Sequence, residues 1–202
     1  MTREQYIGNA IKEMISKGVT CSFIRRKRYS KNSTSYFDSL GLTWTAVPKL
    51  VVNYFKDDFD STFEIFIHEY CHFKQWEEQS DIWKNGIANW FIFELFLQNK
   101  FDNFTKDQLK TIQLLELDCD KKVLEDINRY KLKVDTSKYI KESNSYIYSY
   151  NVSYDVKNFY TNIDYNDERL LALLPDVPFT VDNIQTPIYE YDTIYKELLA
   201  AT

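Results

Sequence analysis

The sequence predicts a predominantly helical α+β fold, with a small antiparallel sheet that precedes one buried helix. Three observations support this fold class. After about residue 60, apolar residues recur at three- and four-residue steps, which is the spacing of one helix face. Segments that look extended, among them the β-branched run Lys49–Phe55, come before that point. Only four glycines and four prolines occur in 202 residues, which argues against an extended linker.

The first elements are expected to be one helix and then a few strands. Residues 2–17 have helical spacing, Thr2 suits the N-cap, and Gly18 suits the end of the helix. Extended segments are expected at residues 19–29, 42–45 and 49–55, with a loop over residues 30–39. We expect two to four strands in an antiparallel sheet.

The next helix is expected to be buried, although it carries a stripe of polar residues. Ser61 and Glu64 fit a capping box, so the helix is predicted to begin at Ser61. From Phe63 to Phe73 it is apolar on almost every side, as expected of a core helix. The polar residues along it recur at three- and four-residue steps and are Glu64, His68, His72, Gln75 and Gln79. Each such group buried without a partner costs about 1–3 kcal/mol. A metal ion would satisfy the two histidines.

Further helices and a tail are expected after this helix. The helical segments are residues 81–99, 105–130 and 137–158, with Ser137 as a cap; the alternation over residues 146–150 would also suit a strand. Three prolines after residue 174 indicate a mainly irregular tail, which could end in a short helix over residues 189–200. We therefore expect one domain over residues 1–160, with its core at 40–130, and a tail over 161–202 that packs on it.

The two histidines of the chain stand four positions apart, in the segment His68-Glu69-Tyr70-Cys71-His72. Residues four apart share one face of a helix, so both imidazoles can present a nitrogen to one metal ion. With Glu69 the segment completes H-E-x-x-H, in which the histidines bind zinc and the glutamate is the general base. The predicted cofactor is therefore Zn²⁺.

A catalytic zinc usually has three protein ligands and one open position, so a third ligand is needed. Without another histidine, this ligand must be Asp, Glu or Cys. The segment Glu116-Leu-Asp-Cys-Asp120 interrupts the apolar positions of the 105–130 helix. Glu116 is expected to bind the metal, and Asp120 to accept the ring N–H of a ligand histidine. Alternatively, Glu116 and Asp118 are surface residues and Asp120 pairs with Lys121 or Lys122.

Two cysteines adjoin these motifs. Cys71 and Cys119 each stand one residue before the last residue of a motif, on helices that must approach each other closely. A small apolar side chain permits this approach, and a buried cysteine suits the position. A cysteine ligand, or a cysteine nucleophile that uses His72, is the alternative.

H-E-x-x-H on one helix and E-x-x-x-D on a later helix resemble the gluzincin clan of zinc metallopeptidases. Many compact members have E-x-x-A-D, and the segment from Glu116 to Asp120 is similar, with cysteine in place of alanine. The resemblance covers roughly residues 40–130 and extends to metallopeptidase-like proteins of phages and bacteria. It implies His68, His72 and Glu116 as zinc ligands, Glu69 as the general base, and a zincin-like fold whose small sheet flanks the substrate.

The predicted function is zinc-dependent hydrolysis of a protein or peptide substrate, which would lie along a sheet edge at Leu50–Tyr54. No downstream histidine is present to stabilise the oxyanion, so the predicted donors are Tyr146, Tyr148 and Tyr150. The alternative is a catalytically inactive metal-binding protein with a structural or interaction role. A regulatory protease that cleaves one particular partner is a third possibility.

Composition excludes some classes of function and favours one location. The net charge of −5 gives no support to nucleic-acid binding. No apolar run reaches the roughly 20 residues of a membrane span, and the first residues lack the apolar core of a signal peptide. Three cysteines, an odd number, do not suggest a disulfide framework. We therefore expect a cytoplasmic protein, in the host cytoplasm if a phage encodes it.

Overall fold

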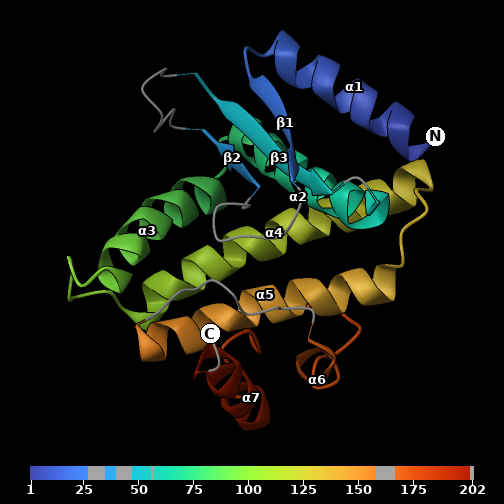
Figure 1. Cartoon of the computed structure of the whole chain (residues 1–202). Coiled ribbons are helices and arrows are strands. Elements are labelled where there is room, and N and C mark those ends of the chain that lie inside the picture. The colour runs from blue at the N-terminus through green and yellow to red at the C-terminus, as the bar shows by residue number, and fades with distance from the viewer. Residues whose placement is uncertain (27–34, 40–46, 56, 158–166, 201–202) are drawn as a thin grey trace. The chain divides into compact units, whose positions relative to one another are not determined.

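The computed structural model describes residues 1–26, 35–39, 47–55, 57–157 and 167–200 (Figure 1). The chain forms two compact units. The first unit comprises Met1–Gln79 and Cys119–Val134, and the second comprises Ser80–Asp118 and Asp135–Thr202. The long helix α4 (Lys106–Tyr130) contributes residues to both units. The predicted α+β class, mainly helical with a small sheet, is confirmed.

Within the described residues, the strands of the first unit form one mixed sheet in the order β1-β3-β2. They are β1 (Thr20–Arg26), β2 (Tyr36–Asp38) and β3 (Lys49–Phe55). β1 pairs parallel to β3, whereas β2 pairs antiparallel to it. The prediction of an antiparallel sheet is therefore wrong for β1. A parallel pair needs a crossover of a dozen or more residues, and residues 27–48 supply that length.

The position of β3 overturns a second prediction. Because β3 lies between β1 and β2, Leu50–Tyr54 is not an edge strand on which a peptide substrate could pair. The predicted loop over residues 30–39 is also wrong at β2, where Phe37 packs its ring against Phe73 and Trp76. The strand predicted at residues 42–45 lies outside the described residues.

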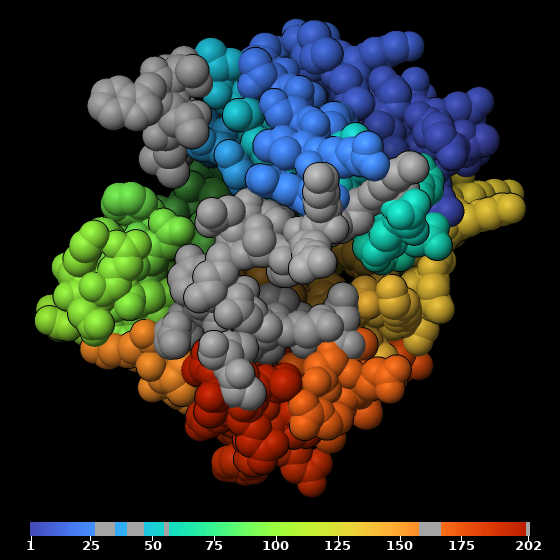
Figure 2. All heavy atoms as spheres, viewed as in Figure 1, coloured from blue at the N-terminus to red at the C-terminus, as the bar shows by residue number. Residues whose placement is uncertain are grey.

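Helix α1 (Arg3–Ser16) confirms the first predicted helix. Thr2 is its N-cap and forms a capping box with Gln5, and Gly18 adopts a φ of +80° after its last turn. α1 packs on β1, and the dark blue and lighter blue atoms of these two elements lie next to each other in Figure 2.

Helix α2 (Phe59–Glu78) carries the H-E-x-x-H segment. Its N-cap is Asp58, whose side chain accepts a hydrogen bond from the Ser61 backbone N–H. The predicted start at Ser61 is therefore wrong. Asp58 supplies the capping oxygen, and α2 begins at the next residue, Phe59. α2 packs on β3 and β2. Its apolar residues with no exposed surface are Phe63, Phe66, Ile67, Cys71 and Phe73.

The second unit consists of helices around two buried clusters. Its elements are α3 (Asp81–Leu97), the first part of α4, α5 (Thr136–Val156), α6 (Glu168–Leu171) and α7 (Tyr189–Ala200). The cluster between α3, α4 and α5 contains Phe93, Phe96, Phe104, Leu109, Ile112 and Tyr150. The cluster between α5 and the C-terminal segment contains Ile147, Tyr148, Val152, Leu170, Leu174, Phe179, Ile184, Tyr191 and Tyr195.

The helices predicted over residues 81–99, 105–130, 137–158 and 189–200 are confirmed by α3, α4, α5 and α7. The strand alternative over residues 146–150 is wrong, and the cap of α5 is Asp135 in place of Ser137. α6 and α7 pack on α5. The division into a domain over residues 1–160 and a tail over 161–202 stays a prediction. In the described part of the chain, every helix is too short or too polar to cross a membrane.

Candidate metal centre

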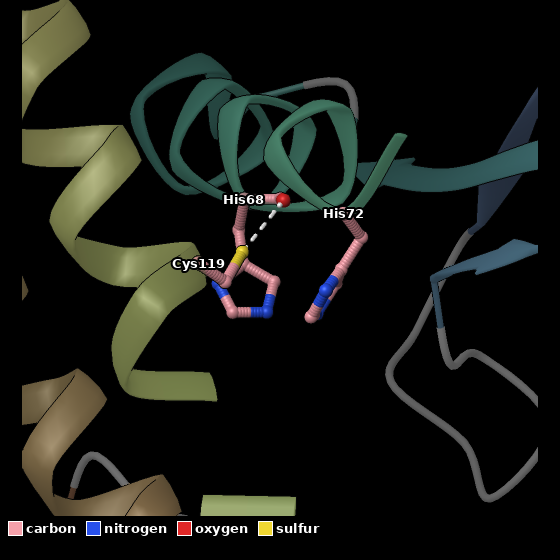
Figure 3. A group of neighbouring side chains, drawn as sticks. All are labelled: His68, His72 and Cys119. Atoms are coloured by element: carbon pink, nitrogen blue, oxygen red, sulfur yellow. Dashed lines mark hydrogen bonds between the residues drawn. The ribbon is translucent and has the colours of Figure 1, made fainter. Parts of the chain in front are cut away.

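Helix α2 presents His68 and His72 on one face, one turn apart. The two imidazole ring centroids are 4.7 Å apart and the ring planes are perpendicular. In Figure 3 both rings project from the same side of α2. Both side chains are partly buried. The surrounding apolar residues of α2 are buried in the core, and His68 lies beside Asp120 and Cys119 of α4.

Cys119 of α4 completes a group with the two histidines (Figure 3). The ligand atoms of His68, His72 and Cys119 all lie within 4.8 Å of one another, so these residues could hold a metal ion. Cys119 has no exposed surface. Its thiol donates a hydrogen bond to the His68 backbone oxygen, with an Sγ–O distance of 3.2 Å. Its Sγ lies 3.8 Å from His68 Nδ1.

Each histidine has a hydrogen-bond partner at Nδ1. His68 Nδ1 lies 3.1 Å from Oδ1 of Asp120, and His72 Nδ1 lies 2.8 Å from Oε1 of Gln75. Asp120 and Gln75 are both buried. The sequence predicted that Asp120 would contact a ligand histidine, and the contact with His68 is present. That this histidine binds a metal ion stays a prediction.

The sequence did not lead us to predict the contact between Gln75 and His72. Gln75 appeared in the polar stripe of the sequence, and its spacing three residues after His72 was the signal that could have indicated the contact.

Glu69 is buried on α2 directly after His68, with 9% of its surface exposed. Its role as general base stays a prediction.

The remaining predicted residues belong to the second unit. Glu116 is buried, and the Tyr150 hydroxyl donates to its Oε1 at 3.4 Å. The Tyr146 and Tyr150 hydroxyl oxygens are 2.8 Å apart. Tyr148 belongs instead to the cluster with the C-terminal segment, where its hydroxyl accepts from the Ile188 N–H at 2.6 Å. The three predicted oxyanion donors therefore have different surroundings.

Cys71 is unsuited to be a nucleophile. Burial raises the pKa of its thiol well above the usual value, and the nearby Cys119 adds to this effect. A thiol held neutral by burial is chemically inert, because the thiolate is the reactive form. Its burial agrees with the expectation that Cys71 is a packing residue of α2.

Comparisons with protein-family models, with curated proteins and with solved structures find no match to this chain. The gluzincin resemblance therefore rests on the residues of the two motifs alone.

Proposed function

We propose that this chain is a zinc-dependent metallopeptidase whose metal ion is bound by His68 and His72. The supporting observation is the convergence of these two rings with Cys119 in a group that could hold a metal ion. The donors suit zinc, because imidazole with thiolate or carboxylate is a typical zinc ligand set. Hydrogen-bond acceptors behind both rings are also typical of metal-binding histidines.

Glu116 is the third ligand that we propose, on the strength of its place one turn before Asp120 in α4 and of the motif resemblance. Cys119 is the competing candidate, because it lies within the group of ligand atoms. The thiol of Cys119 already donates to the His68 backbone oxygen, which suits a packing residue. We therefore expect Cys119→Ala to keep zinc and Glu116→Ala to lose it. The reverse result would make Cys119 the ligand.

In the proposed reaction, water adds across the peptide C–N bond: its hydroxyl joins the carbonyl carbon and its proton reaches the leaving amine. Bound zinc would supply Lewis acidity. Glu69 would take the proton of the attacking water and deliver it to the amine nitrogen. The carboxylate follows His68 directly on α2, so the general base and the first ligand share one rigid helix.

The substrate edge must differ from Leu50–Tyr54, because β3 is central. We propose β2 as the strand that pairs with an extended peptide. β2 packs on the C-terminal half of α2, where Phe37 contacts Phe73 and Trp76 next to His72.

Tyr146 and Tyr150 stay the proposed oxyanion donors. Tyr148 is less suited, because its hydroxyl accepts a hydrogen bond from Ile188 in the cluster of α5 with the C-terminal segment. A cytoplasmic location and the absence of nucleic-acid and membrane partners stay predictions.

The test is the pair Glu69→Gln and Glu78→Gln, two equal chemical changes on α2. Glu78 is exposed and pairs with Lys122, so its variant is the control. Each protein is loaded with zinc and incubated with mixture-based peptide libraries, and cleavage is followed by mass spectrometry. We expect zinc in all three proteins and cleavage by wild type and Glu78→Gln only.

Equal cleavage by Glu69→Gln would refute the proposed base. A wild type that binds zinc stoichiometrically yet cleaves nothing would refute general peptide hydrolysis. That result would favour the alternatives: a regulatory protease with one partner, or a metal-binding interaction protein without catalysis.

A further inference from the structure

The side chain of Gln75 contacts His72 one turn along α2. Its Oε1 lies 2.8 Å from Nδ1 of the imidazole, and the Gln75 side chain has no exposed surface. Residues three apart on a helix are neighbours on its surface, so this contact follows from the helix geometry itself.

The chemistry of the contact determines where the imidazole carries its proton. An amide oxygen is only an acceptor, so the nitrogen facing it must be the N–H. In a neutral imidazole the other nitrogen, Nε2, then holds the lone pair. We propose that Gln75 is a positioning residue that fixes the Nδ1–H tautomer of His72 and thereby makes Nε2 the metal-binding atom.

The ligand part of this inference rests on the proposed function, whereas the tautomer does not. His68 has the same arrangement with Asp120, so the two histidines share one tautomer and present the same ring nitrogen. The partners differ in charge: His68 faces a carboxylate and His72 a neutral amide. A second carboxylate in the fully buried position of Gln75 would carry a desolvation cost that the amide avoids.

The tautomer can be measured directly, because the chain has only two histidines. Imidazole ¹⁵N shifts are recorded on metal-free full-length protein at a pH where both rings are neutral, and a His68→Gln variant assigns the two rings. We expect His72 to show a protonated Nδ1 and an unprotonated Nε2. A protonated Nε2 in the wild type would overturn the proposal, and this measurement needs no Gln75 variant.

Two variants then test the role of Gln75. Gln75→Met keeps the length and removes the acceptor, so we expect His72 to move toward the Nε2–H form and zinc affinity to fall roughly 10–100-fold. Gln75→Glu, measured at a pH where its carboxyl is ionised, offers only acceptors, so the Nδ1–H form should be kept. An unchanged tautomer and unchanged zinc affinity in Gln75→Met would contradict the inference. Absence of peptide cleavage, by contrast, would bear only on the proposed function.

Discussion

The Nδ1 atom of His68 lies 3.1 Å from Oδ1 of Asp120, across 52 residues of sequence. The side chains are 20% and 7% exposed, so a buried carboxylate faces the ring of a partly buried histidine. A carboxylate accepts the Nδ1–H proton and leaves the lone pair on Nε2, which is the arrangement found behind metal-binding histidines. This contact links α2 to the part of α4 that belongs to the same unit.

Asp120→Ala should weaken zinc binding about 10–100-fold, because His68 loses the acceptor that orients its ring. Asp120→Asn should cost less, since its amide oxygen can still accept. The measurement is competition with a chromophoric chelator. Asp107→Ala, an exposed change on the same helix, is the control. If Asp107→Ala and Asp120→Ala bind zinc equally well, Asp120 has no part in the centre.

Gly86 of α3 is a site of close helix packing within the second unit. A Cβ atom built there would lie 2.6 Å from Leu115 Cβ and 2.9 Å from its Cδ2. Gly86→Ala should therefore lower the free energy of unfolding by about 1–3 kcal/mol through overpacking, less the helix-propensity gain of about 1 kcal/mol. Urea unfolding measures the change.

Gly8 of α1 provides the matched substitution, because nothing lies within 4 Å of its hypothetical Cβ. Gly8→Ala should stabilise the chain by about 0.5–1 kcal/mol. A stabilised Gly86→Ala variant would show that Leu115 moves aside freely and would contradict the close packing.

Asp126 is a shared acceptor in the first unit. It accepts hydrogen bonds from the Tyr6 hydroxyl and from the Lys74 ammonium group beside a cavity of about 70 Å³. Burial raises the pKa of Tyr6, so its hydroxyl stays a proton donor. Asp126→Ala should lower the free energy of unfolding by about 1.5–3 kcal/mol, the range for hydrogen bonds to charged groups.

Tyr6→Phe removes one of these bonds and should cost about 0.5–1.5 kcal/mol. The exposed change Asp176→Ala is the control in the same urea titrations. An Asp126→Ala variant within about 0.5 kcal/mol of this control would contradict the shared-acceptor interpretation.

The contribution of Asp192 of α7 to the free energy of unfolding should decrease as pH rises. Burial raises the pKa of its carboxyl above the usual value of 3.8, and its Oδ1 has no hydrogen-bond partner among the described residues. The folded chain therefore holds this proton to a higher pH than the unfolded chain. The resulting stabilisation is complete below pH 3.8 and is lost as pH rises through the folded pKa.

Asp192→Asn is neutral at every pH and lacks this loss. Its stability relative to wild type should increase as pH rises from 3.8. Urea midpoints of both proteins across a pH series measure the difference. A difference that is constant, or that decreases with pH, would contradict the prediction.

Much of the helical part of the fold follows from local sequence. Apolar residues at helical spacing located α4 and α5, the apolar richness of residues 81–99 indicated α3, and Thr2 marked the cap of α1. The sheet was harder, because strand order depends on contacts distant in sequence. Nothing local in Lys49–Phe55 indicates that it lies between β1 and β2. The three-residue strand β2 is too short to show a period.

The candidate site divides in the same way. The sequence predicted that His68 and His72 share one helix face, and that Glu116 and Asp120 share another, because each pair is four residues apart. The contact between Gln75 and His72 obeys the same rule, yet a buried glutamine on an apolar helix has many possible partners. The place of Cys119 beside the histidines depends on how α4 meets α2 in the first unit, which no local pattern encodes.

The most direct test of the metal centre is the zinc content of the protein purified without chelator, measured by inductively coupled plasma mass spectrometry beside His68→Ala and His72→Ala. We predict close to one zinc per chain in wild type and almost none in either variant, with all three proteins folded by circular dichroism. A folded wild type that contains no zinc and takes up none on dialysis would contradict the account.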